Sequence, residues 1–502
     1  MTDESADVER DRHVAPRGWV NPPPAGRYHL VVLGGGPAGL VAAAGAAGLG
    51  AKVALIEQLR LGGDCLNFGC VPSKALLKSA RVAATVRDAA GFGVAVPEGS
   101  RVEFAAVMER MRRLRAALAP HDSAARFQGL GVDVFFGAGR FTSPDSIDVQ
   151  GQSLRFRRAV IATGARAAVP AIPGLADVPF VTNETIFSLA TLPRQLVVLG
   201  AGPIGCELAQ AFARLGSQVT LINSAANVLS KEDAEAARMV ETSLRRDGIE
   251  ILANARVIGV GRQGSERQMT IECDVAGRGR ISRNANELLV AVGRTPNVSG
   301  LGLEVAGIEF DARSGIRVDD RLRTTNSRVF AAGDVCSRFQ FTHAADAMSR
   351  IVLQNALFPG RGRASTLVIP RCTFTDPELA VVGLTEAEAR ERGVAIDVLV
   401  EEFSHNDRAV LEGQTAGFAK LLLKRGTDQI VGATIVGASA GEMISEITLA
   451  MTAKLSLGSL AKTIHPYPTH SEIIKRLADQ SQRRRLTPKV QWLFAKWFGW
   501  TS

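Results

Sequence analysis

Residues 34–39, Gly34-Gly35-Gly36-Pro37-Ala38-Gly39, separate an apolar run at 28–33 from an alanine-rich segment that reaches Gly50. This order predicts a strand, a tight turn and a helix, followed by a second strand at 52–56 that ends at Glu57. Glycines here let the backbone approach a pyrophosphate at a helix N-terminus, and an acid about twenty residues further on can hold a ribose hydroxyl. Such a turn also occurs without a ligand, but in this context it predicts a dinucleotide site.

The same arrangement recurs in the middle of the chain. A strand is expected at 195–199, then a turn at Gly200-Ala201-Gly202-Pro203-Ile204-Gly205, a helix up to Gly216 and a second strand at 218–222. One such turn could occur without a ligand, but two turns of this kind in one chain are much less often both ligand-free. The sequence therefore predicts two dinucleotides.

The two units differ at the end of their second strand. Where the first has Glu57, the second has Asn223-Ser224, so no acid is present to hold a free 2′-hydroxyl. A 2′-phosphate would not be repelled there, and we expect NADPH rather than NADH. The following loop has no arginine, and Lys231 is the nearest cation.

Two cysteines lie in the stretch 62–74, Gly-Gly-Asp-Cys-Leu-Asn-Phe-Gly-Cys-Val-Pro-Ser-Lys. Cys65 and Cys70 are five positions apart at the start of an expected helix, where two thiols can meet across one turn. Because a helix N-terminus favours negative charge, both thiols should be reactive when reduced. We predict a redox-active disulfide. Half of a zinc site is the alternative, but the spacing is wide and no second pair at ligand spacing follows, so we expect no metal.

The composition is that of an ordinary globular protein of about three domains, with 502 residues, 46% hydrophobic and 22% charged. Six cysteines are too few for a secreted disulfide scaffold, and the acidic N-terminus has no apolar signal core, so we expect a cytoplasmic protein. Residues 475–502 hold seven Lys or Arg against one Asp, which accounts for +6 of the net charge of +9. The basicity is a property of the tail, and we expect no nucleic-acid partner.

Further motifs follow in a fixed order: Ala162-Thr163-Gly164, Val292-Gly293-Arg294-Thr295-Pro296-Asn297, Ala331-Ala332-Gly333-Asp334 and His465-Pro466-Tyr467-Pro468-Thr469-His470-Ser471-Glu472. Together with the two glycine turns and the cysteine pair, they resemble the class I flavin-dependent pyridine nucleotide-disulfide oxidoreductases. The match covers about residues 28–480. Within this group the chain is most similar to mercuric-reductase-like and dihydrolipoamide-dehydrogenase-like proteins, the former through residues 207–216 and the C-terminal motif.

The resemblance implies an α/β fold with two Rossmann-like dinucleotide-binding domains, for FAD and NAD(P), and a C-terminal α+β dimerisation domain. A polar, proline-rich composition predicts a disordered leader before them. The expected parts are the leader, 1–27; the first part of the FAD-binding domain with the redox disulfide, 28–180; the NAD(P)-binding domain, 181–292; the second part of the FAD-binding domain, 293–365; the dimerisation domain, 366–480; and a basic aromatic tail, 481–502.

The resemblance places FAD on the first turn, with Glu57 at the adenosine ribose and Asp334 near the ribityl chain. NAD(P) is expected on the second turn. The residues implied for FAD are Gly34, Gly36, Pro37, Ala38, Gly39, Glu57, Gly63, Asp64, Lys74, Gly137, Ala138, Thr163, Gly164 and Asp334, and those implied for NAD(P) are Gly200, Gly202, Ile204, Gly205, Asn223 and Gly293.

The resemblance also implies how electrons pass through the cysteine pair. Cys70 would face the flavin as the charge-transfer thiol, and Cys65 would meet the substrate as the interchange thiol. Lys74, one turn beyond Cys70, would lie by the flavin N5 region and pair with Glu207 of the second glycine-turn helix. Taken singly, a lysine on a helix is more often solvated, and a glutamate more often belongs to a weak surface ion pair.

The C-terminal motif is where the chain departs from part of the family. The family forms homodimers whose last motif enters the partner's active site, and dihydrolipoamide dehydrogenases carry His-x-His-Pro-Thr-x-x-Glu there, with the second His as acid-base. Here Tyr467 stands at that His, His465 at the first, and Glu472 is retained. A phenol with a pKa near ~10 accepts protons poorly at neutral pH, which disfavours exchange with another disulfide. His465 or His470 could assist, or be structural.

Mercuric reductases resemble the chain in having Tyr at this place, although the chain lacks their Cys-x-x-Cys carrier domain and C-terminal vicinal cysteines. We therefore predict electron flow from NADPH to FAD, to Cys65–Cys70 and to a small-molecule or metal-ion acceptor such as Hg(II). Dihydrolipoamide dehydrogenase is the second hypothesis. A membrane-surface redox sensor or adaptor is a third, of another class.

The third hypothesis comes from the tail. Three of the four tryptophans lie within 492–500, and Arg483 to Arg485 and Lys489 precede them. On a helix, one side would carry Val490, Leu493, Trp497 and Trp500. Basic residues followed by such a segment predict peripheral contact with an anionic membrane through 481–502. Packing of these aromatics on the protein body or on a dimer partner is the alternative.

Overall fold

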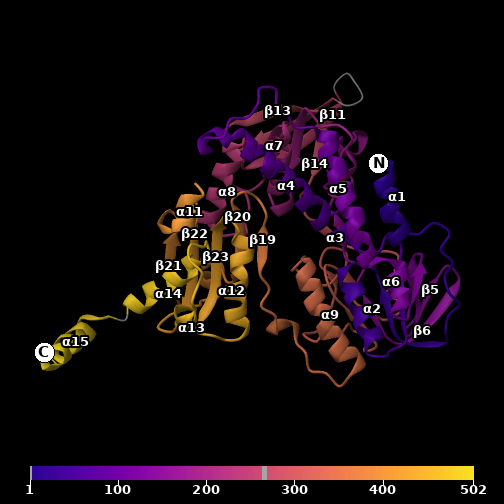
Figure 1. Cartoon of the computed structure of the whole chain (residues 1–502). Helices are drawn as coiled ribbons and strands as arrows, with labels where there is room; N and C mark the ends of the chain where they lie inside the picture. The colour runs from indigo at the N-terminus through magenta and orange to yellow at the C-terminus, as the bar shows by residue number, and fades with distance from the viewer. Residues whose placement is uncertain (1–2, 263–267, 485, 502) are drawn as a thin grey trace. The chain divides into compact units, whose positions relative to one another are not determined.

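The chain divides into two compact units in the computed structural model, which describes residues 3–262, 268–484 and 486–501 (Figure 1). The first unit comprises Met1–Ser224 and Ile249–Leu367, and the second comprises Ala225–Gly248 and Val368–Ser502. Both predicted dinucleotide sheets thus lie in the first unit. Residues 225–248, which we expect in the NAD(P)-binding domain, are grouped with the second unit, and the expected domain bounds stay a prediction.

The first unit is built around a sheet in the order β3-β2-β1-β6-β5-β4, with β18 pairing β6. β1 pairs in parallel with both β2 and β6, as expected for a doubly wound sheet. The strands are β1 (Arg27–Leu33), β2 (Val53–Glu57), β3 (Val132–Phe136), β4 (Gly139–Ser143), β5 (Ser146–Val149), β6 (Gln152–Ile161) and β18 (Val329–Ala331). The strands predicted at 28–33 and 52–56 are confirmed to within one residue.

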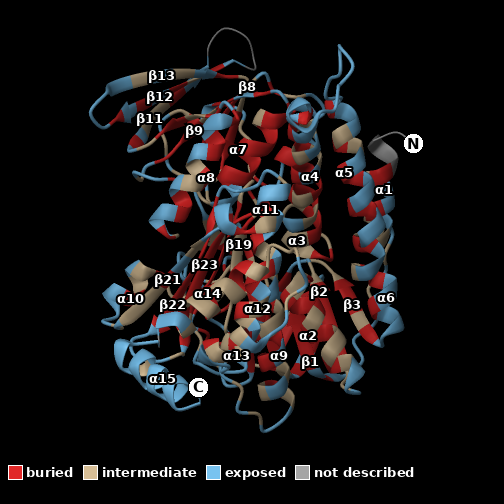
Figure 2. Ribbon diagram, turned by 60° about the vertical axis from the view of Figure 1, so that its left-hand side comes forward, coloured by how far each residue is buried: buried red, intermediate tan, exposed pale blue. Residues whose placement is uncertain are grey.

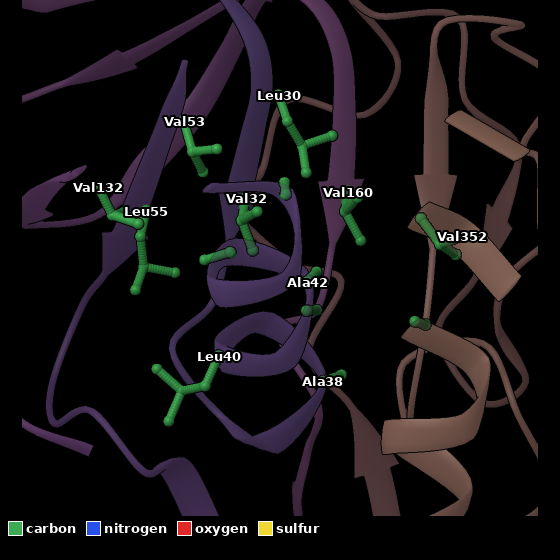
Figure 3. Packing of buried hydrophobic residues seen from close by; sticks show 14 of the residues in the cluster. Leu30, Val32, Ala38, Leu40, Ala42, Val53, Leu55, Val132, Val160 and Val352 are labelled. Carbon is green, nitrogen blue, oxygen red and sulfur yellow. The ribbon is translucent and has the colours of Figure 1, made fainter. Parts of the chain in front are cut away.

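Small side chains let two helices pack closely on this sheet. In Figure 3, Leu30 and Val32 of β1 and Leu55 of β2 gather over Ala42 of α2 (Pro37–Gly48), with Val352 of α9 (Thr342–Leu357) to one side. The remaining helices of this part are α1 (Asp3–Val14), α3 (Gly63–Asn67), α4 (Cys70–Arg87), α5 (Phe104–Leu118) and α6 (Ala124–Gly129). This packing holds the first glycine turn at the carboxyl edge of the sheet.

The predicted disordered leader differs from the structure, in which α1 occupies Asp3–Val14. Two arginines outside the helix explain why a polar segment is ordered. Arg115 of α5 donates to Asp7 (2.6 Å), and Arg60 donates to Asp11 (2.9 Å). Val14 is fully buried, and its carbonyl accepts from Leu61 N. Tertiary ion pairs, which composition does not report, therefore fix this helix.

A second parallel sheet, β10-β9-β8-β14, carries the second glycine turn. The predicted strands at 195–199 and 218–222 are confirmed, and α7 (Pro203–Leu215) joins them. An antiparallel sheet and a short pair complete the region. The strands are β8 (Gln195–Leu199), β9 (Gln218–Ile222), β10 (Glu250–Leu252), β14 (Glu287–Val290), β11 (Ala255–Arg262), β12 (Met269–Val275), β13 (Gly279–Ala285), β7 (Ala165–Ala167) and β15 (Arg294–Pro296).

The second unit is an antiparallel sheet in the order β19-β20-β23-β22-β21, packed with helices. Its strands are β19 (Arg371–Thr373), β20 (Glu378–Gly383), β21 (Ile396–Glu402), β22 (Phe418–Lys424) and β23 (Ile430–Gly437). Its helices are α8 (Ala234–Arg246), α10 (Glu386–Glu391), α11 (Asp407–Leu411), α12 (Ala440–Thr452), α13 (Leu457–Lys462), α14 (Glu472–Arg484) and α15 (Pro488–Thr501). This is the expected C-terminal α+β domain. Figure 2 shows its strands largely buried and α15 exposed.

Across the described ranges, no helix is both long and apolar enough to span a bilayer.

Candidate active site

The first glycine turn, between β1 and α2, has a backbone that only glycine fits. Gly34 has a φ of +111°, and a Cβ there would lie 2.4 Å from the carbonyl oxygen of Ala162. A Cβ on Gly39 would lie 1.8 Å from Gly34 O, and one on Gly63 would lie 2.6 Å from Gly36 Cα. Backbone from two segments therefore meets at the N-terminus of α2, where unpaired N–H groups suit a pyrophosphate. These residues fit the predicted FAD site.

Glu57, at the end of β2, lies on this turn. Its carboxylate accepts hydrogen bonds from Gly35 N (2.6 Å) and Leu59 N (2.6 Å). Burial raises the pKa of Glu57, and these backbone N–H groups oppose the rise. Gly137 N donates to Glu57 O, which brings the end of β3 to the same place. The carboxylate that we expect at the adenosine ribose is thus held by the backbone around the turn.

The second glycine turn repeats this geometry but is more open. Gly200 has a φ of +99°, and a Cβ there would lie 2.5 Å from Ala291 O. A Cβ on Gly205 would lie 1.9 Å from Gly200 O, whereas one on Gly202 or Gly293 would meet no atom within 4 Å. The turn therefore has room beside Gly202 for a ligand to approach.

Asn223, from which we predict NADPH, directly follows β9 and is buried. Its N–H donates to Leu252 O (2.8 Å), and its carbonyl accepts from Ala255 N (2.9 Å). Ser224, directly after it, is exposed. The strand end is thus fixed by its backbone, and the nucleotide preference stays a prediction.

The cysteine pair spans two helices rather than one. Cys65 is inside α3, and Cys70 is the first residue of α4, with a break at residues 68–69. Both are free thiols within hydrogen-bonding contact, and Cys70 Sγ lies 3.4 Å from Thr342 Oγ1 at the start of α9. The helix start predicted for the pair is correct for Cys70, while Cys65 belongs to the short helix before it.

The two thiols have opposite acidities. The Cys65 thiol donates to Cys70 and, with the Thr342 hydroxyl and the charge of Lys74, lowers the pKa of Cys70 to about 6 against an opposing effect of burial. The same hydrogen bond, and then burial, raises the pKa of Cys65. We expect both thiols to be reactive when reduced; the lowered pKa favours the thiolate at Cys70, and the raised pKa favours the protonated thiol at Cys65. The roles of the two thiols in electron transfer stay a prediction.

Lys74 and Glu207 form the predicted ion pair. Lys74 Nζ lies 2.9 Å from Glu207 Oε2, and the Glu207 side chain on α7 is 6% exposed. The pair joins the helix that begins at Cys70 to the helix that begins at the second glycine turn. The contact is confirmed, and its role in the reaction stays a prediction.

Arg294, in the motif at residues 292–297, makes contacts that its sequence neighbourhood does not predict. Its guanidinium is 3.2 Å from Asp64 and 3.4 Å from Asp334, and it donates to Ala165 O (2.7 Å). Asn183 also donates to Asp64 (3.0 Å). Burial raises the pKa of Asp334, against the attraction of Arg294. Two carboxylates expected at FAD are therefore bridged by one nearly buried cation.

The remaining residues expected at FAD lie at the same edge of the first sheet. Thr163 and Gly164 follow β6, and Thr163 Oγ1 donates to Asn297 O (2.8 Å). Asn297 Nδ2 donates back to Thr163 O (2.9 Å). Gly137 and Ala138 follow β3. Carboxyl ends of parallel strands are where dinucleotides bind in such sheets, so the expected set is brought together in one place.

The C-terminal motif lies in the second unit, and its tyrosine has a partner that the sequence did not suggest. Tyr467 is 71% exposed, and its hydroxyl donates to Asp407 Oδ2 (2.8 Å). Glu472, which occupies the position of the orienting acid in dihydrolipoamide dehydrogenases, lies 3.6 Å from Arg476. Asp407 raises the pKa of Tyr467. The phenol is thus a proton donor held by Asp407.

The two histidines of this motif are each paired with an acid. His465 Nε2 lies 3.1 Å from Glu446, and the His465 side chain is nearly buried. His470 Nε2 lies 2.9 Å from Glu412, and its ring packs edge-on against Phe403. A carboxylate partner suits a structural histidine and an acid-base histidine alike, so both interpretations of these residues stay open.

Of the other four cysteines, Cys206 and Cys273 are buried and Cys336 and Cys372 partly so. Among the described residues, no group of three or more His, Cys, Asp or Glu side chains could hold a metal ion.

Known proteins match this chain along most of its length. The family model of pyridine nucleotide-disulphide oxidoreductase matches residues 28–349, and that of the dimerisation domain of the same family matches 369–478. The chain is 34% identical over 448 residues to a mercuric reductase of Bacillus cereus, covering 89% of this chain and 70% of that protein. It is also 34% identical over 462 residues to a dihydrolipoyl dehydrogenase of Thermus scotoductus, covering 91% and 98%.

Solved structures agree with the sequence matches. The HOCl-induced flavoprotein disulfide reductase RclA from Escherichia coli superposes with a TM-score of 0.79 at 30% identity, covering 90% of this chain and 99% of that one. A Cu(II) complex of the same reductase matches equally well. Relatives with different acceptors are thus about equally similar to this chain.

Proposed function

The chain belongs to the pyridine nucleotide-disulphide oxidoreductase family, and within it we propose that the protein passes electrons from NADPH through FAD and the Cys65–Cys70 pair to a thiophilic metal ion or another small acceptor. The family uses FAD and NAD(P)H, and the dimerisation domain supports a homodimer. The choice of NADPH, the acceptor and the roles of single residues are the proposed part.

The contact between the two thiols, with Thr342 Oγ1 3.4 Å from Cys70 Sγ and Lys74 one turn further along α4, is the observation that supports this proposal most directly. FAD, which the residues of the first glycine turn would hold, would supply the hydride and electron-transfer chemistry between the nicotinamide and the disulfide. Reduction of the Cys65–Cys70 bond then consumes one electron pair and one proton. Cys70 is left as the thiolate, stabilised by Thr342 and Lys74, and Cys65 as the thiol. Cys65 is then the sulfur that meets the acceptor.

Lys74 links the helix after the second glycine turn to the Cys65–Cys70 pair. Its ammonium group stabilises negative charge at Cys70 and is anchored by the buried carboxylate of Glu207 on α7. We propose that this ion pair holds the start of α4 in the position that electron transfer requires. Glu207 is then a positioning residue.

Tyr467 is the residue on which our prediction of the electron acceptor depends. Its hydroxyl already donates to Asp407, which raises the pKa of Tyr467, so it does not accept protons near neutral pH. An acceptor that needs little proton transfer, such as Hg(II) or Cu(II) held by thiolates, therefore fits better than lipoamide. The mercuric reductases among the relatives are named for a metal-ion acceptor.

Anaerobic NADPH titration of the purified protein tests the electron path. We expect a long-wavelength thiolate–flavin absorption band on reduction, and its absence would overturn the path. Cys65→Ser should show that band already in the oxidised protein and lose acceptor turnover. Cys372→Ser, at a partly buried cysteine of the second unit, is the matched control and should behave like the unaltered protein.

An acceptor panel of Hg(II) with excess thiol, Cu(II), lipoamide, glutathione disulfide and quinones tests the second part. We expect turnover with a metal ion and little with lipoamide. Tyr467→His should raise lipoamide turnover by about a hundredfold, because an imidazole restores a proton acceptor. Rapid lipoamide turnover by the unaltered protein would instead establish dihydrolipoamide dehydrogenase, the second candidate, which is favoured by its equal sequence identity.

A membrane-surface sensor or adaptor is the candidate of another class, motivated by the tail. Removing residues 481–502 separates it from an enzyme: an enzyme keeps its turnover, whereas an adaptor loses its association with vesicles or partners while NADPH oxidation is unchanged.

A further inference from the structure

Helix α15 (Pro488–Thr501) is apolar and exposed at once. None of its residues is buried. Six large apolar side chains on it are each about half or more exposed, namely Trp492, Leu493, Phe494, Trp497, Phe498 and Trp500. Folded proteins rarely leave such a patch to water unless it contacts a partner or a membrane. This helix is therefore a candidate contact surface.

The residues of α15 are arranged as on a helix that lies along a bilayer surface. At about 100° per residue, six apolar side chains cover roughly half of the circumference of α15. They are Val490, Leu493, Phe494, Trp497, Phe498 and Trp500. Lys489 and Lys496 lie next to that arc, and Lys496 Nζ is 4.0 Å from the Trp492 ring centroid. Tryptophan favours the level of the lipid headgroups, and lysine can extend from the apolar face to reach them.

Charge distinguishes between the surfaces that could cover α15. Residues 475–502 contribute +6 of the net +9, so the other 474 residues together carry only +3. No acidic residue follows Asp479. A protein body of small positive net charge, whether of this chain or of a second copy, gives a basic helix no net electrostatic attraction, whereas an anionic surface outside the protein does.

We propose that α15, with Arg483, Arg484 and Lys489 before or within it, binds the surface of an anionic phospholipid bilayer and lies in the plane of the headgroups. Its 14 residues would extend about 21 Å, which is less than the hydrocarbon core. The helix thus rests on the bilayer without crossing it. The inference is independent of the electron acceptor, so its failure leaves the proposed function standing.

Vesicle flotation of the full-length, FAD-loaded protein tests the proposal. We expect binding to vesicles of phosphatidylcholine with phosphatidylglycerol, weaker binding at high salt, and little binding to phosphatidylcholine alone. Trp497→Ser with Trp500→Ser should weaken binding by roughly tenfold or more, because two large side chains no longer enter the interface. Phe92→Ser, at a similarly exposed aromatic residue of the first unit, is the matched control and should bind normally.

Tryptophan fluorescence gives an independent measurement. Trp19→Phe removes the one tryptophan outside the tail, so the remaining emission comes from Trp492, Trp497 and Trp500. Anionic vesicles should shift that emission to shorter wavelength. Absence of both flotation and shift would overturn the proposal. So would equal binding to neutral vesicles, or an assembly larger than a dimer that the double serine variant dissociates, since the helix would then serve self-association.

Discussion

The two glycine turns have almost the same backbone and very different surroundings. In both, a Cβ on the last glycine would lie within 2 Å of the first glycine's carbonyl oxygen, at Gly39 in one and Gly205 in the other. In the first turn, the backbone of Gly63 lies against Gly36, and the Glu57 carboxylate accepts from Gly35 N. In the second turn, nothing lies within 4 Å of a Cβ at Gly202. The shared backbone follows from binding a pyrophosphate. The difference suits a retained cofactor in the first turn and an exchanging one in the second.

The largest effect should come from adding a methyl group at the last glycine of each turn. Gly39→Ala forces the backbone of the first turn apart, and we expect protein without FAD, measured by flavin absorbance after gel filtration. Gly205→Ala should retain FAD and lose reduction by NADPH. Gly48→Ala, in the same helix as Gly39 but with open space around its Cβ, is the control and should keep both. Loss of FAD in the Gly205 variant would contradict the assignment of the two turns.

Glu57→Gln should have the next largest effect. The glutamine has an NH2 group where the glutamate has an oxygen, so Gly35 N or Leu59 N loses its acceptor, and the negative charge is removed as well. An unsatisfied buried donor costs about 1–3 kcal/mol, so FAD should bind roughly tenfold to a hundredfold more weakly, measured by equilibrium dialysis. Binding of NADPH to the FAD-loaded variant should be unchanged. An unaltered FAD affinity would show that the carboxylate is not needed at this turn.

Asn223→Asp tests the difference at the matching position of the second turn. A carboxylate there would repel a 2′-phosphate and accept a ribose hydroxyl, so kcat/KM should shift from NADPH toward NADH by about tenfold. The ratio of the two kcat/KM values is the measurement, and the thermal unfolding midpoint serves as the control for folding. A strong preference for NADH in the unaltered protein would contradict the interpretation of Asn223.

The smallest effect concerns the ion pair between α4 and α7. With a pKa of about 6 for Cys70, the thiolate–flavin band of the reduced protein should persist as pH falls to about 6 and disappear below it, since a lowered pKa favours the thiolate above that value. Lys74→Met should move the midpoint toward higher pH by about one unit, because the charge that stabilises the thiolate is gone. Lys78→Met, on an exposed part of the same helix, should not move it. An unshifted midpoint in the Lys74 variant would exclude its electrostatic role.

Short-range patterns predicted the turns and their strands well. Gly34, Gly39, Gly200 and Gly205 are all needed for local backbone reasons, so their spacing is enough to identify them. Family resemblance, rather than pattern, predicted the contact of Lys74 with Glu207, which are 133 positions apart.

The features that the sequence did not predict depend on contacts between residues far apart in the chain. Asp407 of α11 lies 60 positions from Tyr467, and no local rule joins a partly exposed acid to a tyrosine in a distant loop. Arg294 was visible in a motif, but its bridge between Asp64 and Asp334 needs three separate segments to meet. The same holds for α1, whose Asp7 pairs with an arginine 108 positions away. Composition averages over such contacts and therefore predicted disorder for this segment.

Helix α1 has a practical consequence for anyone who shortens the protein to obtain crystals. A chain cut to begin at Arg27 loses Asp7, and of the hydrogen bonds that Arg115 makes to described residues, the one to the carbonyl oxygen of Asn67 (2.8 Å) is left. Asn67 ends the short helix that carries Cys65. Such trimming would remove both the counter-ion of Arg115 and the helix packed on α5, at a guanidinium whose other hydrogen bond is made two residues from Cys65, so the shortened protein is a poor substitute for studying Cys65.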